Sequence, residues 1–117
     1  MNAKLYPSMR FEDSEAALTF LRDAFGFKER SVYRDDDGKL RHAEMSLGDE
    51  TIMFGDGDPA TGSGVYVAVD DLDALYERAK AAGAEITREL QDTEYGSREF
   101  SARDIGGHAW HFGTYRP

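Results

Sequence analysis

Hydrophobic and polar positions alternate with two different periods along the chain, and each period occurs in both halves. Apolar side chains recur at helical spacing over residues 14–25 and again over residues 71–82. Each segment begins at a residue type that caps helix N-termini and is followed by a glycine, Gly26 or Gly83, of the kind that ends helices. These two glycines are 57 residues apart, as are the two starts. We therefore predict two helices in equivalent positions of an internal repeat.

Alternating apolar and polar positions, typical of β-strands, surround both predicted helices. They predict strands over residues 5–11, 27–34, 39–47 and 51–55 in the first half, and over 65–69, 85–89, 97–103 and 108–115 in the second. A stretch rich in Gly, Asp and Pro over residues 56–63 separates the halves. We expect one α+β domain over residues 1–117, built from βαβββ units that cover residues 4–55 and 64–115.

The predicted strands present one apolar face and one face of mixed chemistry. The apolar face, with Trp110 and Phe112 among its side chains, is expected to pack against the helices. The opposite face would line a cleft if the sheets curve toward each other; otherwise it is a solvated sheet face. Its candidate ligand-binding residues are Tyr6, Arg10, His42, Glu44, Phe54, Tyr66, Glu99, Arg103 and His111.

The charge balance argues against two classes of partner. The chain has 23 acidic and 14 basic residues, a formal net charge of −9, and no cluster of Lys and Arg. Nucleic acids and anionic membranes both attract basic surfaces, so we expect neither as a partner. An acidic chain does allow a cationic ligand. The absence of cysteine excludes a thiol nucleophile and fits a cytoplasmic protein.

Two stretches carry a resemblance to a known superfamily. Residues 67–75 read Val-Ala-Val-Asp-Asp-Leu-Asp-Ala-Leu and lead to Lys-Ala-Ala-Gly-Ala at 80–84, and residues 103–112 read Arg-Asp-Ile-Gly-Gly-His-Ala-Trp-His-Phe. Together with the tandem βαβββ pattern they resemble the vicinal oxygen chelate superfamily, which holds glyoxalase, extradiol dioxygenases, fosfomycin resistance enzymes and bleomycin resistance proteins. Ile105 and Gly106 depart from that superfamily's Asp-Pro-x-Gly-His/Asn-x-Trp-x-Phe ending. The resemblance implies the glyoxalase/bleomycin resistance fold, in which curved mixed sheets surround a cleft.

The resemblance also implies where a metal would be held, on the first and last strands of each unit. The matching positions here are Tyr6, Phe54, Gly64 and His111. Only the histidine is a usual ligand, whereas a divalent site needs three or more protein ligands. We therefore expect no metal and no other cofactor, which places the chain in the metal-free, bleomycin-resistance-like branch. An atypical metal site built from His42, Glu44 and Glu99 is the alternative.

The function implied by that branch is binding without chemistry. Its members sequester a drug or metabolite unaltered, and they usually form homodimers. In this chain Tyr6, Phe54 or Tyr66 would stack on a planar ligand, and the two glutamates, Glu44 and Glu99, would favour a cationic one. The alternatives are a lyase, isomerase or dioxygenase that uses an atypical metal site or His/Glu acid–base chemistry, and an interaction module without a small-molecule site.

The expected lack of a metal can be tested on purified protein. Elemental analysis should find less than about one Ni, Zn, Mn or Fe ion per chain, because the four matching positions offer too few ligands. One tightly held ion per chain that is lost in a His111→Ala variant would contradict this expectation.

Overall fold

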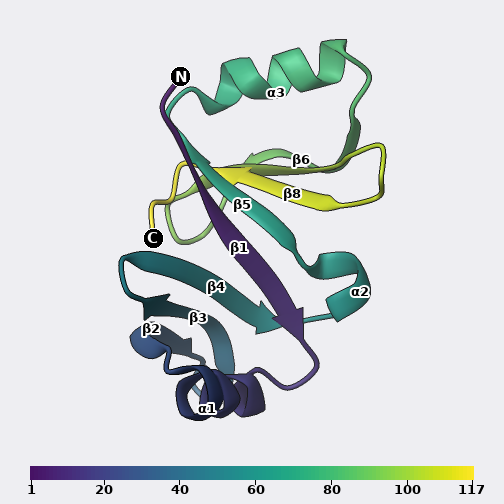
Figure 1. Cartoon of the computed structure of the whole chain (residues 1–117). Helices are drawn as coiled ribbons and strands as arrows, with labels where there is room; N and C mark the ends of the chain where they lie inside the picture. Colours follow the sequence, from purple (N-terminus) through teal and green to yellow (C-terminus); the bar gives the residue numbers. More distant parts are fainter. The chain divides into compact units, whose positions relative to one another are not determined.

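Eight strands and three helices follow one another in this computed structural model, which describes residues 1–117 (Figure 1). They are β1 (Ala3–Phe11), α1 (Ser14–Phe25), β2 (Lys28–Arg34), β3 (Leu40–Leu47), β4 (Glu50–Asp56), α2 (Pro59–Gly62), β5 (Gly64–Val69), α3 (Leu72–Ala81), β6 (Glu85–Asp92), β7 (Arg98–Arg103) and β8 (Ala109–Gly113). The α+β class and the tandem βαβββ order are confirmed. The short helix α2 was not expected from the Gly-rich stretch; Asp58 caps it and Pro59 begins it.

The chain folds into two compact units. The N-terminal unit consists of residues 6–63, and the C-terminal unit consists of residues 1–5 together with residues 64–116. The first residues join the C-terminal unit through Asn2, whose backbone nitrogen donates to the Asp70 side chain at 3.1 Å and whose carbonyl accepts from the Asp70 backbone at 3.3 Å. None of the three helices is long and apolar enough to span a membrane.

In the N-terminal unit the strands lie in the order β2-β3-β4-β1, with β1 parallel to β4 and the other neighbours antiparallel. Helix α1 begins where the Asp13 side chain accepts from the Ala16 nitrogen at 3.1 Å, and it ends at Gly26, whose φ of 78° is left-handed. Its buried side chains complete the core of this unit, which is formed by Ala17, Leu18, Leu21, Leu40, Ala43, Met45, Ile52 and Phe54.

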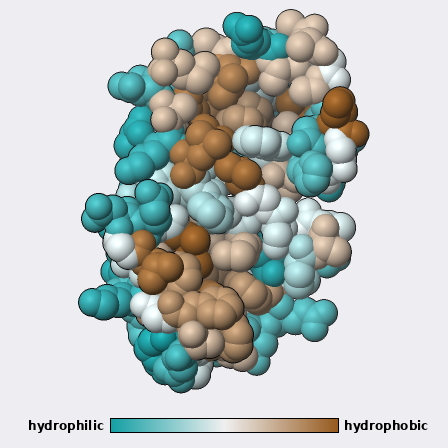
Figure 2. Space-filling view, in the orientation of Figure 1, coloured by the Kyte–Doolittle hydropathy of each residue, from teal (hydrophilic) through white to brown (hydrophobic).

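The last residue of α1 departs from the expected apolar stripe. Phe25 is 59% exposed and contacts the equally exposed ring of Phe20, with the ring centroids 5.1 Å apart. Side chains of brown, hydrophobic colour reach the surface over α1 in the space-filling view (Figure 2).

In the C-terminal unit the strands lie in the order β5-β8-β7-β6, with β5 parallel to β8. The centre of its core is the fully buried ring of Phe100, which stacks on Phe112 at 4.7 Å and meets Tyr76 of α3 edge-on at 5.1 Å. Trp110 and Phe112 pack against this core, as the sequence predicts. Gly64 is required where β5 approaches β8, because a Cβ there would lie 1.9 Å from the carbonyl oxygen of Ala109.

The outermost strand of each unit is irregular. Strand β6 shifts its register against β7 between Ile86 and Arg88 and again between Arg88 and Gln91. Strand β2 shifts against β3 between residues 29 and 31 and between residues 33 and 34. Such bulges turn a side chain toward the other face of a sheet. Ile86 accordingly pairs with Ala102 of the core face, whereas Arg88 pairs with Ser101 of the opposite face.

Burial of Phe54 predicts a large difference between two phenylalanine substitutions. Phe54 is fully buried in the core, whereas Phe20 is 55% exposed. Phe54→Ala should lower the free energy of unfolding by about 3–5 kcal/mol, because it removes buried apolar area and leaves a cavity. Phe20→Ala should cost about 1 kcal/mol or less, the value of one surface aromatic contact. Urea denaturation measures both, and equal losses would contradict the core assignment.

Candidate functional site

Two glutamates carry their carboxylates out of water, one in each unit. Glu44 of β3 is 2% exposed and Glu99 of β7 is 6% exposed. A buried carboxylate is costly unless charged or hydrogen-bonding groups meet it. The groups that meet these two carboxylates therefore define the chemistry of each unit.

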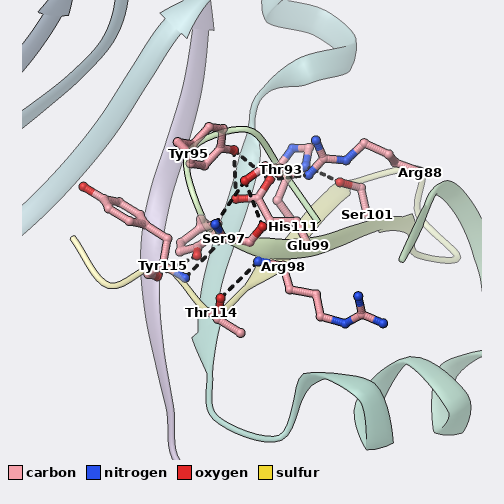
Figure 3. Close-up of polar contacts among 11 residues, drawn as sticks. Arg88, Thr93, Tyr95, Ser97, Arg98, Glu99, Ser101, His111, Thr114 and Tyr115 are labelled. Atoms are coloured by element: carbon pink, nitrogen blue, oxygen red, sulfur yellow. Dashed lines mark hydrogen bonds and ion pairs between the residues drawn. The ribbon is translucent and has the colours of Figure 1, made fainter. Parts of the chain in front are cut away.

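Glu99 is held by two side chains that come from neighbouring parts of the C-terminal unit (Figure 3). The Arg88 Nη2 atom donates to Oε1 of Glu99 at 2.7 Å. The hydroxyl of Tyr95 lies 2.9 Å from both carboxylate oxygens. We call Tyr66, Arg88, Tyr95 and Glu99 the Glu99 cluster. The Glu99 carboxylate is neutralised by one guanidinium and accepts a hydrogen bond from one phenol.

The turn between β6 and β7 brings Tyr95 to this position. Thr93 fixes the turn: its hydroxyl donates to the Ser97 carbonyl at 2.8 Å and accepts from the Ser97 backbone nitrogen at 3.1 Å. Gly96, with a φ of 86°, supplies the left-handed residue that closes it. Tyr95 as a whole is 69% exposed, but partial burial of its hydroxyl, and then the hydrogen bond of that hydroxyl to Glu99, raise the pKa of the Tyr95 hydroxyl above its ordinary value. The hydroxyl therefore stays a donor at neutral pH.

Tyr66 of β5 lies beside Glu99 because β8 offers a glycine at this point. A Cβ on Gly113 would lie 2.6 Å from the Tyr66 hydroxyl oxygen and 3.1 Å from Cγ of Glu99. The Tyr66 hydroxyl donates to the Tyr115 carbonyl at 2.6 Å. Burial, and then the charge of Glu99, raise the pKa of Tyr66 far above its ordinary value.

His111 of β8 continues the same face. Its backbone pairs with Tyr66 on one side and with Ser101 on the other, and its Nδ1 lies 2.8 Å from the Ser101 hydroxyl. Strand alternation places Glu99 on this face as well, two residues before Ser101. The structure thus brings together three of the residues predicted from the sequence: Tyr66, Glu99 and His111.

In the N-terminal unit Glu44 is met by a histidine. The His42 Nε2 atom lies 2.8 Å from Oε2 of Glu44, and the half-exposed ring of Tyr33 lies over His42 with the centroids 5.8 Å apart. Tyr6 is buried on β1, two residues before the buried Ser8. His42, Glu44 and Tyr6 were predicted from the sequence; Tyr33 was not.

Three predicted residues take other positions. Phe54 pairs with Ala43 in the core, while Met53 is the β4 residue that pairs with Glu44. The equivalent of His111 is therefore Met53, because the repeat offset slips by one residue in the last strands. The Arg103 Nε atom lies 3.4 Å from a carboxylate oxygen of Glu85, whereas Glu99 is met by Arg88 and Tyr95.

The third of these residues, Arg10, packs against the segment after β4. Its side chain lies over two glycines of the segment after β4: a Cβ on Gly57 or Gly62 would approach it to 2.9 or 2.6 Å. Its backbone nitrogen donates to the Ser63 hydroxyl at 2.9 Å. Arg10 thereby links β1 to the α2 segment.

Two members of the Glu99 cluster were missed by the sequence analysis. Arg88 lies between two bulges, so simple alternation would put it on the core face with Ile86. Tyr95 lies in a turn, where alternation says nothing about direction. The Thr-x-x-Gly-Ser turn of residues 93–97 is the one signal that could have pointed to Tyr95.

The residues at the metal positions of the superfamily do not fit a metal ion. The sequence match gave Tyr6, Phe54, Gly64 and His111 for these positions; the strand registers instead pair Ser8 with Met53 in the N-terminal unit and Tyr66 with His111 in the C-terminal unit. A single imidazole among them is too few ligands for a divalent ion. No group of three or more Asp, Glu or His side chains is arranged to hold one elsewhere. We derive no metal-dependent step.

An open depression of about 370 Å³ borders the Glu99 cluster. It is lined by Arg88, Gln91, Asp92, Thr93, Glu94 and Tyr95. It therefore lies along the end of β6 and the β6–β7 turn, and Arg88, which holds Glu99, is one of its walls.

Comparison with known proteins establishes the family. The model of the Glyoxalase/Bleomycin resistance protein/Dioxygenase superfamily matches residues 6–112, and the chain belongs to that superfamily. An uncharacterized protein of Mycobacterium bovis is 30% identical over 123 residues, which covers 93% of this chain and 81% of that protein. An uncharacterized protein of Mycobacterium tuberculosis is also 30% identical, with coverages of 93% and 72%.

Solved structures agree on the fold. A superfamily member from Vibrio splendidus 12B01 is 19% identical, with a TM-score of 0.77 and coverages of 96% of this chain and 98% of that chain. Methylmalonyl-CoA epimerase from Mycobacterium tuberculosis is 19% identical, with a TM-score of 0.71 and coverages of 96% and 87%. At these identities the likeness shows a shared fold alone.

The raised pKa of Tyr66 predicts a loss of stability at alkaline pH. The unfolded chain releases this proton near pH 10, whereas the folded chain holds it to higher pH. The resulting stabilisation is fully present below about pH 10 and is lost as the pH rises through the folded-state value. Urea denaturation between about pH 8 and pH 11 should therefore show a steeper fall for the wild type than for Tyr66→Phe. Identical slopes would contradict the burial of this hydroxyl.

Proposed function

We propose that the protein binds a small molecule and sequesters it unaltered, and that the ligand is a planar, positively charged drug or metabolite. The observation that carries this proposal is the Glu99 carboxylate, in a residue that is 6% exposed, which accepts from the Tyr95 hydroxyl and lies near the Tyr66 hydroxyl. A carboxylate beside aromatic rings suits a flat cation, because the carboxylate attracts its charge and the rings can stack on its plane. A homodimer is part of the proposal.

The net charge of the whole chain supports a cationic ligand. With a net charge of −9, its field attracts cations and repels anions over distances of about one Debye length, ~8–10 Å at ordinary salt. Within the cluster the carboxylate can accept two parallel N–H bonds from a planar amidinium or guanidinium, the strongest of the charge-assisted pairings. Both tyrosine hydroxyls remain protonated, so they add donors rather than negative charge.

The chemistry of the remaining residues favours binding over metal-dependent catalysis. Ser8 and Met53 in the N-terminal unit and Tyr66 in the C-terminal unit are not usual metal ligands, and they stand at the strand positions where the resemblance to metal-dependent members implies ligands. The Glu99 carboxylate already accepts hydrogen bonds from two donors, so a cationic ligand can bind to it by replacing one of those donors. The metal-free, bleomycin-resistance-like branch is therefore the branch we propose.

One observation favours an enzyme as the second candidate. His42, with a side chain 28% exposed, is oriented by the buried Glu44 at 2.8 Å. An imidazole held by a carboxylate can act as a general base, as in an isomerase that moves a proton on its substrate. This candidate places the chemistry at His42 in the N-terminal unit, whereas sequestration places the affinity at Glu99.

Three isosteric probes test the proposed cation preference: 2-naphthamidinium, 2-naphthamide and 2-naphthoate. Isothermal titration calorimetry should show the cation bound about tenfold more tightly than the neutral amide, the value of one charge-assisted pairing. Glu99→Gln should abolish most of this preference, because the amide offers no negative charge to the amidinium. Added salt should weaken the preference in the wild type.

The matched control is Glu77→Gln, which makes the same charge change on an exposed position of α3. It should keep the wild-type preference. Binding of 2-naphthoate as tightly as the cation, or an unchanged preference in Glu99→Gln, would overturn the proposal.

A further inference from the structure

The ion pair at the centre of the Glu99 cluster is asymmetric. The Glu99 side chain is 8% exposed, whereas that of Arg88 is 41% exposed, and their closest atoms are 2.7 Å apart. The Glu99 side chain is almost closed off from water, whereas the Arg88 side chain borders it. If the pair separates, Arg88 is the partner that moves.

The strand that carries Arg88 is suited to such a movement. Strand β6 is the outermost strand of its unit and pairs with β7 alone. Two register shifts flank Arg88, so the ladder is interrupted on both sides of it. The long side chain therefore depends on its contact with Glu99, rather than on regular pairing, to stay over this face.

The depression beside the cluster offers the displaced guanidinium a second position. Arg88 lines it together with two carboxylate residues, Asp92 and Glu94. Asp92 already lies 3.0 Å from Arg98, and Glu94 is exposed. Rotation about the side-chain bonds of Arg88 would move its guanidinium away from the buried carboxylate of Glu99. The guanidinium would then lie near the carboxylates of Asp92 and Glu94, which are in contact with water.

We propose that Arg88 is an exchangeable counter-ion of Glu99 and the residue that sets the ligand class of the site: the ligand is a planar amidine or guanidine whose head group takes the place of the Arg88 guanidinium. This inference rests on the proposed function and deepens it. The guanidinium of Arg88, which donates from Nη2 to Oε1 of Glu99, shows that the site accepts a flat cation beside the hydroxyl of Tyr95. A ligand must therefore outcompete Arg88, which makes Arg88 a determinant of both affinity and selectivity.

The first test removes the competitor. Arg88→Met keeps the apolar stem and removes the charge, so 2-naphthamidinium should bind about fivefold more tightly, the value of one partly exposed ion pair. Arg88→Lys, which keeps the charge without the planar fork, should give an affinity between those of the wild type and Arg88→Met. Arg78→Met, the same change on an exposed position of α3, should leave the affinity at the wild-type value. Calorimetry at fixed salt measures all four proteins.

The second test needs no ligand. The Tyr95 hydroxyl bonds to the carboxylate that Arg88 neutralises, and the positive charge of Arg88 lowers the pKa of that hydroxyl. In Arg88→Met the Tyr95 pKa should therefore rise, as followed by the ¹³Cζ chemical shift of Tyr95 in a pH titration. The Arg78→Met variant should titrate as the wild type does.

The outcomes separate this inference from the proposed function. An unchanged Tyr95 titration, or a cation affinity that is unchanged or lower in Arg88→Met, would overturn the exchange. A changed titration accompanied by equal binding of 2-naphthamidinium and 2-naphthoate would retain Arg88 as the counter-ion and reject the cation-binding function. Tighter cation binding in Arg88→Met together with a raised Tyr95 pKa supports both.

Discussion

Burial of the Glu99 carboxylate is the constraint on which the C-terminal unit depends. At 6% exposure the charge must be met by donors, and each neighbouring feature of the fold supplies or admits one. The bulges of β6 turn Arg88 onto the face, and the turn after β6 carries Tyr95. Gly113 leaves the space that Tyr66 and the Glu99 side chain occupy. Irregularities that look like defects of a sheet are therefore the parts that serve the site.

The N-terminal unit applies the same architecture to different chemistry. Its buried carboxylate, Glu44, lies opposite Met53 and is met by His42 rather than by an arginine. Its irregular outer strand delivers Tyr33, an aromatic ring, where the C-terminal unit delivers Arg88. Because Met53 is the equivalent of His111, the counterpart of Glu44 in the C-terminal unit is Ser101 rather than Glu99. The two copies of one supersecondary unit therefore carry their buried acids at different strand positions, which changes what each can bind.

Local signals predicted the fold well because capping and alternation act over a few residues. Helix α1 begins and ends at the predicted residues, and alternation correctly placed Glu44, Glu99 and His111 opposite the core. Phe54 was misplaced because a constant repeat offset does not reveal a one-residue slip. Arg88 was missed because the bulges that redirect it depend on pairing between distant strands, which no local pattern records.

If Glu99 anchors a planar cation by releasing Arg88, a crystal structure of the protein with 2-naphthamidinium will show the exchange. We expect the amidinium nitrogens on both oxygens of Glu99, the naphthalene ring against tyrosine, and the Arg88 guanidinium turned toward Asp92 and Glu94. A ligand bound elsewhere while Arg88 stays on Glu99, or an amidinium on Glu99 with the Arg88 contact intact, would contradict it.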